Sequence, residues 1–261
     1  AAEAAGLASR SYGTVTSAIP ADRARLRNQG ALLKEVRELL TLSRGYGMES
    51  VRQRAMSTAE TVSASLSEVV DDSTLELVVD LRLAFGRLLA ALGANERAEK
   101  EHLDTAELSL SQGWTESACA ALALASHAAQ ARGDRASSGR AWRQCRDAME
   151  SWPMNRPGER CGILVDAVGD PLVAVQVLSA LAEILVDGVE EDHSRAPIIR
   201  EIISRASEQA SRCVSPPQGA VESLARVEER VAPYGRGRGG RRRPGSTTTI
   251  TTDGQAAAGG E

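Results

Sequence analysis

The sequence predicts an all-α fold, and three observations lead to that prediction. Apolar residues recur at helical spacing through most of the 261 residues. No segment alternates apolar and polar residues over the length of a strand. Turns of about two to five residues separate the apolar segments, and such short turns make successive helices antiparallel. We expect helices over roughly residues 22–44, 49–70, 74–92, 96–111, 115–132, 134–151, 157–168, 171–186, 195–213 and 220–231.

The composition indicates which side chains fill the core between these helices. Hydrophobic residues make up 42% of the chain but aromatic residues only 3%, with Phe85 as the single phenylalanine. A core with so few rings is filled by Leu, Val, Ile and Ala, which suits closely packed helices. On the helix expected over residues 96–111, the inward-facing positions are expected to be Ala98, Leu103, Ala106 and Leu110.

Changes in composition divide the chain into four parts. Residues 1–21 are small and polar, and we interpret them as a flexible lead-in. Residues 22–213 carry the apolar helical pattern and are expected to form one helical-repeat domain. Residues 214–232 are expected to hold a short C-terminal helix. Residues 233–261 are rich in Arg, Gly and Thr and have too little apolar surface to fold, which predicts a disordered tail.

Two segments of the helical domain match each other at a spacing of 40 residues. Gly93 and Gly133 are 40 residues apart, and each ends an apolar helix and begins a polar one. Small residues on both helices of such a hairpin let the helix axes approach closely, and a ring in the second helix fills the space below. The glycine permits the turn. The matched pairs are Gly86 with Ser126, Ala98 with Ser138, and His102 with Trp142.

The pattern between residues 75 and 151 resembles the tetratricopeptide repeat. That family has a small residue late in the first helix, a turn with glycine, and a small residue followed by an aromatic one in the second helix. The period here is 40 residues rather than ~34, which implies longer helices. The segment after Pro157 does not fit the motif, and Arg52 stands where the preceding hairpin would need a small residue. An irregular α-helical domain is the alternative architecture.

The resemblance implies antiparallel helical hairpins that stack as a solenoid. The first helix of each pair would then line a concave surface. Surfaces of this kind bind a peptide or a partner helix. The exposed residues expected near this groove or its turns are Arg82, Asn95, Arg97, Arg132, Arg135 and Arg140.

No motif in the sequence indicates catalysis or cofactor binding. The phosphate-binding glycine loop, the GxSxG elbow and the HExxH zinc motif are all absent from the sequence. His102 and His127 have no further ligand at zinc spacing, and the acidic residues around His193 lack the calcium-loop pattern. We therefore expect no enzyme activity, no cofactor and no metal site, with an all-α enzyme of unrecognised site as the third-ranked alternative.

The charge of the chain is uneven. The net charge of −4 gives no overall attraction to nucleic acid or to an anionic membrane. Five arginines nevertheless crowd into eight residues of the tail, where they are suited to a weak contact with RNA or with an acidic partner. A flexible connector is the alternative interpretation of this segment. The arginines are Arg236, Arg238, Arg241, Arg242 and Arg243.

The most apolar region of the chain is not expected to enter a membrane. It covers residues 163–189 and is interrupted by Asp166, Asp170 and Glu183. A membrane-spanning helix needs about 20 predominantly apolar residues. The region therefore predicts a pair of buried helices.

The spacing of the cysteines indicates the cellular compartment of the protein. Cys119, Cys145, Cys161 and Cys213 are widely spaced, without a CxxC pair, which predicts free thiols in the reducing cytoplasm.

We expect a non-enzymatic scaffold or adaptor module that binds another protein or peptide. The alternative is a sensory or regulatory segment of a larger transcriptional or signalling regulator, an interpretation favoured by the lack of a first Met.

Overall fold

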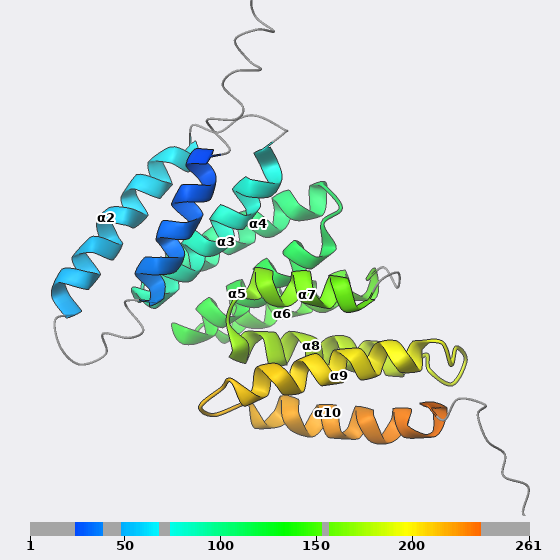
Figure 1. Cartoon of the computed structure of the whole chain (residues 1–261). Coiled ribbons are helices and arrows are strands. Elements are labelled where there is room, and N and C mark those ends of the chain that lie inside the picture. The colour runs from blue at the N-terminus through cyan, green and yellow to red at the C-terminus, as the bar shows by residue number, and fades with distance from the viewer. Residues whose placement is uncertain (1–23, 39–47, 68–73, 153–156, 236–261) are drawn as a thin grey trace, which may run out of the picture.

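The computed structural model describes residues 24–38, 48–67, 74–152 and 157–235 (Figure 1). Every regular element within these ranges is a helix, and no strand occurs in them. The predicted all-α fold is therefore confirmed. The expected lead-in over residues 1–21 lies outside the described residues.

The helices follow the predicted ranges closely. Residues 24–38 are helical and are drawn in dark blue in Figure 1. The labelled helices are α2 (Met48–Ser67), α3 (Leu75–Ala91), α4 (Asn95–Ser111), α5 (Thr115–Ala131), α6 (Arg135–Glu150), α7 (Pro157–Val168), α8 (Pro171–Val186), α9 (Arg195–Ser211) and α10 (Gln218–Val231), followed by the short 3-10 helix η2 (Ala232–Gly235).

Three glycine turns give α3 to α6 their regular spacing. Gly93, Gly113 and Gly133 all have positive φ angles, of 80°, 72° and 84°. At each turn the residue after the glycine donates its N–H to a carbonyl five positions earlier, as Ala94 does to Leu89 at 2.9 Å. This is the Schellman ending of a helix, which requires a left-handed residue. Because α3, α4 and α5 each have 17 residues, the identical turns explain why the hairpin repeats at 40 residues.

The helices pack mainly against their near neighbours in the sequence. α3 packs against α5, α5 against α7, and α7 against α9, while α8 packs against both α6 and α10. The first helices of successive hairpins thus contact one another, and so do the second helices α6, α8 and α10. In Figure 1 the hairpins follow one another in chain order from α2 to α10. Such sequential packing is the arrangement expected for stacked antiparallel hairpins.

Helix α3 joins two hydrophobic clusters. Val79 and Leu83 belong to the larger cluster, which extends through α5 and α8 to α10. Leu81, Phe85 and Leu88 belong to the smaller cluster, which α3 forms with α2 and the helix at residues 24–38. Because α3 buries apolar side chains on both sides, it contributes to both hydrophobic clusters.

The buried face of α4 differs from the one expected. Leu110 is 52% exposed, so the prediction that it faces inward is wrong. The buried positions are instead Ala98 and Ala106 together with four polar residues, which are Glu99, His102, Thr105 and Ser109. Thr105 and Ser109 satisfy their hydroxyls on the carbonyls of Glu101 and Thr105, at 2.6 and 2.8 Å. The spacing of apolar residues cannot reveal a buried helix face that consists of alanines and polar residues.

The C-terminal helix and the start of the tail are part of the folded structure. Leu224, Val227 and Val231 of α10 lie in the larger hydrophobic cluster. Tyr234, in η2, places its ring centroid 4.9 Å from that of His193. Residues 233–235, which fall within the predicted tail, therefore belong to the folded part, and residues 236–261 lie outside the described ranges.

Candidate functional site

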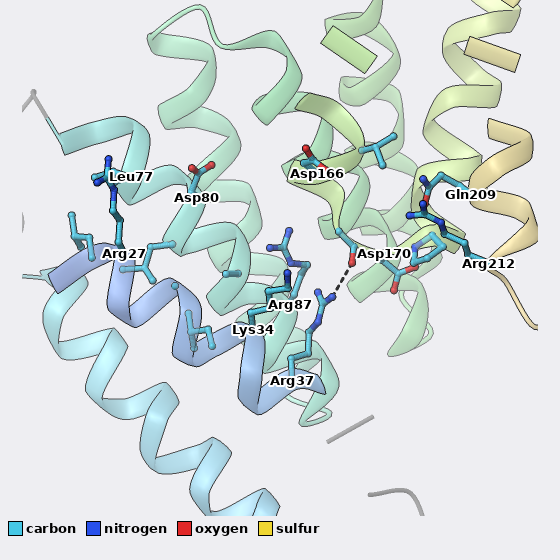
Figure 2. A pocket seen from close by; sticks show the side chains of 18 residues that line it. Arg27, Lys34, Arg37, Leu77, Asp80, Arg87, Asp166, Asp170, Gln209 and Arg212 are labelled. Atoms are coloured by element: carbon cyan, nitrogen blue, oxygen red, sulfur yellow. Dashed lines mark hydrogen bonds between the residues drawn. The ribbon is translucent and has the colours of Figure 1, made fainter. Parts of the chain in front are cut away.

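A cavity of about 590 Å³ lies among the first helices of the hairpins (Figure 2). The helix at residues 24–38 and α3 form one wall, and the turn between α7 and α8 and the end of α9 form the other. The charged residues that line it are Arg27, Lys34, Arg37, Asp80, Arg87, Asp166, Asp170 and Arg212. The apolar part of the lining includes Leu26, Leu33, Leu77, Leu81, Ala84 and Val165.

A second cavity of about 480 Å³ extends the first one along α3. It lies between α3, α5 and α7, and its apolar lining includes Val79, Leu83, Trp114 and Ile163. Asp80, Arg87 and Asp166 line both cavities. The two cavities are therefore neighbours, and we call the pair of them the first-helix groove.

Two arginines at the floor of this groove donate hydrogen bonds to the carbonyls at the C-terminal end of α7. Arg87 donates from Nη1 to the carbonyls of Ala167 and Val168, and the Arg37 guanidinium donates to the carbonyl of Gly169 at 2.9 Å. The last carbonyls of a helix lack partners within the helix and carry partial negative charge, so cations stabilise them. These contacts join the helix at residues 24–38 and α3 to the end of α7 across 80 to 132 positions of sequence.

The charge of Arg87 persists at neutral pH. Burial and the neighbouring charge of Arg37 lower the pKa of Arg87, to about 10. Its Nε is buried and has no hydrogen-bond partner among the described residues. The groove therefore contains a fixed, largely desolvated positive charge where its two cavities meet.

Carboxylates also line the groove, and two of them, Asp80 and Asp166, line both cavities. Glu76 and Asp80 are four residues apart on α3, so they share one face, and Asp166 lies on α7. Burial and the carboxylate of Glu76 raise the pKa of Asp80 above its ordinary value, while Arg87 acts in the opposite direction. Glu116, in the same cavity, forms an ion pair with Arg160.

The arginines predicted at the binding surface do not line the first-helix groove. Arg82 forms an ion pair with Glu101 at 3.1 Å, and Arg132 forms one with Glu99. Both pairs tie α4 to its neighbours, because Arg82 lies on α3 and Arg132 directly follows α5. These two arginines are therefore engaged within the fold.

The other predicted binding residues lie at the turns or on α6. Asn95 and Arg97 lie in the first turn of α4, and Arg97 is exposed. Arg140 donates to the Ser137 hydroxyl at 2.8 Å. Arg135 lines a third cavity, of about 780 Å³, on the side of α6, α8 and α10.

The residues of the repeat pattern lie at the closest approach of the hairpin helices. A Cβ atom on Gly86 would lie 2.4 Å from Cε1 of His102. The Ser126 and Ser138 hydroxyls are 3.0 Å apart, and the Ser126 hydroxyl also donates to the Ser138 carbonyl. Ala98 is fully buried, whereas Trp142 is only partly buried and lines the third cavity with Ser126 and Ser138.

Burial favours the neutral forms of one histidine and two cysteines in the core. Burial lowers the pKa of His102 to about 3. A hydrogen bond with Cys119, together with burial, raises the pKa of Cys145 well above its ordinary value, and burial raises that of Cys161 to about 11. Thiols of this kind are poor nucleophiles, because the thiolate is the reactive form.

Within the described ranges, no group of three or more His, Cys, Asp or Glu side chains is placed to hold a metal ion. Among the described helices, none is both long and apolar enough to cross a membrane. The tail arginines Arg236, Arg238, Arg241, Arg242 and Arg243 lie outside the described residues.

The comparisons with known proteins give no match. No family model, no curated protein and no solved structure matches this chain. The resemblance to the tetratricopeptide repeat therefore rests on the residue pattern, and the function must be argued from the first-helix groove.

Proposed function

We propose that this chain is a non-enzymatic, tetratricopeptide-like interaction module that binds a peptide or helix of a partner protein in the first-helix groove. One observation carries the proposal. The groove is lined by the first helices of successive hairpins, namely the helix at residues 24–38, α3, α5, α7 and α9. Stacked hairpins present an extended binding surface on such a row of helices.

The lining of the groove supports a macromolecular partner. It combines apolar side chains such as Leu77 and Ile163 with charges of both signs. Ile163 is 47% exposed, so its side chain is accessible to a partner at the second cavity. An apolar strip bordered by charges is the usual composition of a protein interface.

The cysteines support a cytoplasmic location as part of the same proposal. All four cysteines are free thiols, and Cys119, Cys145 and Cys161 are buried. Cysteines in oxidising compartments are usually paired in disulfides. A role as the regulatory segment of a larger cytoplasmic protein would use the same groove.

A substitution that fills the groove tests the proposal. Ala84 is a small, partly exposed residue on α3 in the lining of the first cavity, so Ala84→Trp is expected to obstruct it. Peptides selected from a random display library on the full chain should lose about tenfold or more in affinity for this variant, since each lost 1.4 kcal/mol is a factor of ten. The matched control is Ala225→Trp on an exposed position of α10, which should bind as the unchanged chain does. Equal binding by both variants would refute the groove as the site.

A further inference from the structure

Carboxylates outnumber cations in the lining of the second cavity. The four carboxylates belong to Glu76, Asp80, Glu116 and Asp166. Among the described residues of this lining, Arg87 is the one cation. Glu116 forms an ion pair with Arg160, whereas none of the other three carboxylates forms a salt bridge with a described cation. The cavity therefore has an excess of negative charge that the described part of the fold leaves unpaired.

The two carboxylates on α3 are close enough to affect each other. Glu76 and Asp80 are four residues apart, which places them on the same face of the helix. Burial, and then the negative charge of Glu76, raise the pKa of Asp80 above its ordinary value. A cation bound beside these groups favours the ionised form of Asp80, so ionisation of Asp80 and binding of the cation stabilise each other.

The wall beside these carboxylates is apolar. It includes Val79, Leu83, Trp114 and Ile163. Val79 and Leu83 are buried members of the larger hydrophobic cluster, so they form a fixed surface. Trp114 is only partly buried and Ile163 is exposed, so both are accessible to a ligand. A side chain with an apolar stem and a cationic head matches this lining, since the stem covers apolar surface while the head contacts carboxylates.

We infer that the second cavity accepts an arginine side chain of the partner segment. The stem of this arginine lies against Ile163, and its guanidinium lies among the unpaired carboxylates, beside the ring of Trp114. Arginine is favoured over lysine because its planar guanidinium donates to two carboxylates at once and stacks on an aromatic ring. This inference rests on the proposed function, and it adds the residue type that the groove selects.

The cations of the groove do not cancel this attraction. Arg87 donates to the carbonyls of Ala167 and Val168, whose partial negative charge at the helix end partly balances its own charge. The first cavity contains two of the same aspartates, but there further cations such as Arg27 and Lys34 accompany them. The second cavity is therefore the part of the groove that favours an added cation.

The test begins with peptides selected without bias. A random display library is selected on the full chain and counter-selected on Ala84→Trp, so that the retained peptides are groove binders. Each arginine of a retained peptide is then replaced in turn by citrulline, which keeps the shape but not the charge, and by lysine. Fluorescence anisotropy measures the affinities. We expect one arginine per peptide whose replacement lowers the affinity about tenfold for citrulline and about threefold for lysine; we call it the critical arginine.

Variants of the chain locate the critical arginine. Glu76→Gln/Asp80→Asn should lower the affinity of the original peptide about tenfold and leave that of the citrulline peptide unchanged, because the lost interaction is the one between these charges. Trp114→Leu should lower the affinity of the original peptide about threefold. The matched control is Asp104→Asn/Glu107→Gln, at exposed positions of α4 outside the groove, which should bind both peptides as the unchanged chain does.

The possible outcomes separate this inference from the proposed function. Groove-binding peptides without a critical arginine would overturn the inference and leave the proposed function intact. So would equal losses for the original and citrulline peptides on Glu76→Gln/Asp80→Asn, or a lysine peptide that binds as tightly as the original. If no peptide distinguishes Ala84→Trp from the unchanged chain, both fail.

The arginines of the chain's own tail are the competing occupant of the second cavity. In the full chain, Arg236, Arg238 and Arg241–Arg243 are replaced by Gln, and the affinity of the original peptide is measured again. The inference expects no change in this affinity. An increase of about tenfold would show that the tail occupies the cavity, and the inference would be overturned.

Discussion

Gly86 and His102 are in direct contact where α3 crosses α4. A Cβ atom on Gly86 would lie 2.4, 2.7 and 2.8 Å from three atoms of the imidazole ring, all too close for a real side chain. The ring of His102 thus occupies the space that the glycine leaves, and it is 1% exposed. Close approach of the two helices therefore depends on the absence of a side chain at residue 86.

The first prediction is that Gly86→Ala destabilises the protein. The added methyl group must displace a buried ring in a packed core, and such overpacking costs typically ~1–3 kcal/mol. The gain in helix propensity, ~1 kcal/mol, offsets part of this cost. The free energy of unfolding from urea titration should therefore fall. Gly139→Ala is the control, because its Cβ would meet only the Arg143 side chain, at 3.9 Å, and it should stabilise α6.

The second prediction concerns the matching contact in the next hairpin. Ser126 and Ser138 hold α5 and α6 together through hydroxyls 3.0 Å apart. Ser138→Leu should clash there and destabilise the protein by ~1–3 kcal/mol. Ala136→Leu is the control, since residue 136 is exposed on the same helix, and it should change the free energy of unfolding by less than ~0.5 kcal/mol. A harmless Ser138→Leu would contradict the equivalence of the two hairpins.

The helices and their turns could be predicted because local signals determine them. The apolar spacing of α3 and the glycines at residues 93, 113 and 133 act within one or two helical turns. The buried face of α4 could not be predicted in the same way. His102 is buried because Gly86, on another helix, leaves space for it, and no pattern within α4 records that space.

Local sequence signals could not predict the candidate site either, because residues far apart in the sequence form it. Arg37 bonds the carbonyl of Gly169, 132 positions away, so the floor of the groove exists only after the hairpins have stacked. One signal was present in the sequence, since Asp80 and Arg87, like Glu76 and Arg82, are charged residues in a mostly apolar α3. Charged residues on a helix that is buried on two sides indicate a boundary with solvent or a ligand. By contrast, Arg82 and Arg132 were predicted near the groove from the resemblance to the tetratricopeptide repeat, and they form ion pairs within the fold.

The third prediction is a loss of stability in mild acid that depends on His102. Burial lowers the pKa of His102 to about 3 in the folded protein, whereas an unfolded histidine has a pKa of about 6.5. The unfolded state therefore binds one more proton between these values, and stability falls as the pH drops below about 6.5. Between pH 7.5 and 5.5 this single group should cost ~1.4 kcal/mol.

Urea titrations at the two pH values measure this loss. His102→Gln removes the titrating group, so the difference in unfolding free energy between pH 7.5 and 5.5 should shrink by ~1.4 kcal/mol. His193→Gln is the control, because His193 is exposed, and it should keep the pH dependence of the unchanged protein. An identical pH dependence in His102→Gln would show that His102 accepts a proton in the folded state.

The fourth prediction is that Arg87 stabilises the fold through the end of α7. Arg87→Met keeps much of the apolar stem but leaves the carbonyls of Ala167 and Val168 without this donor. Hydrogen bonds from charged groups contribute ~1.5–3 kcal/mol, so the variant should lose about 2 kcal/mol of unfolding free energy. Arg212→Met, which breaks an exposed ion pair with Glu208, should cost less than ~1 kcal/mol. If both variants were equally stable, the Arg87 contacts would not hold α3 against α7, and the first-helix groove would lack a fixed floor.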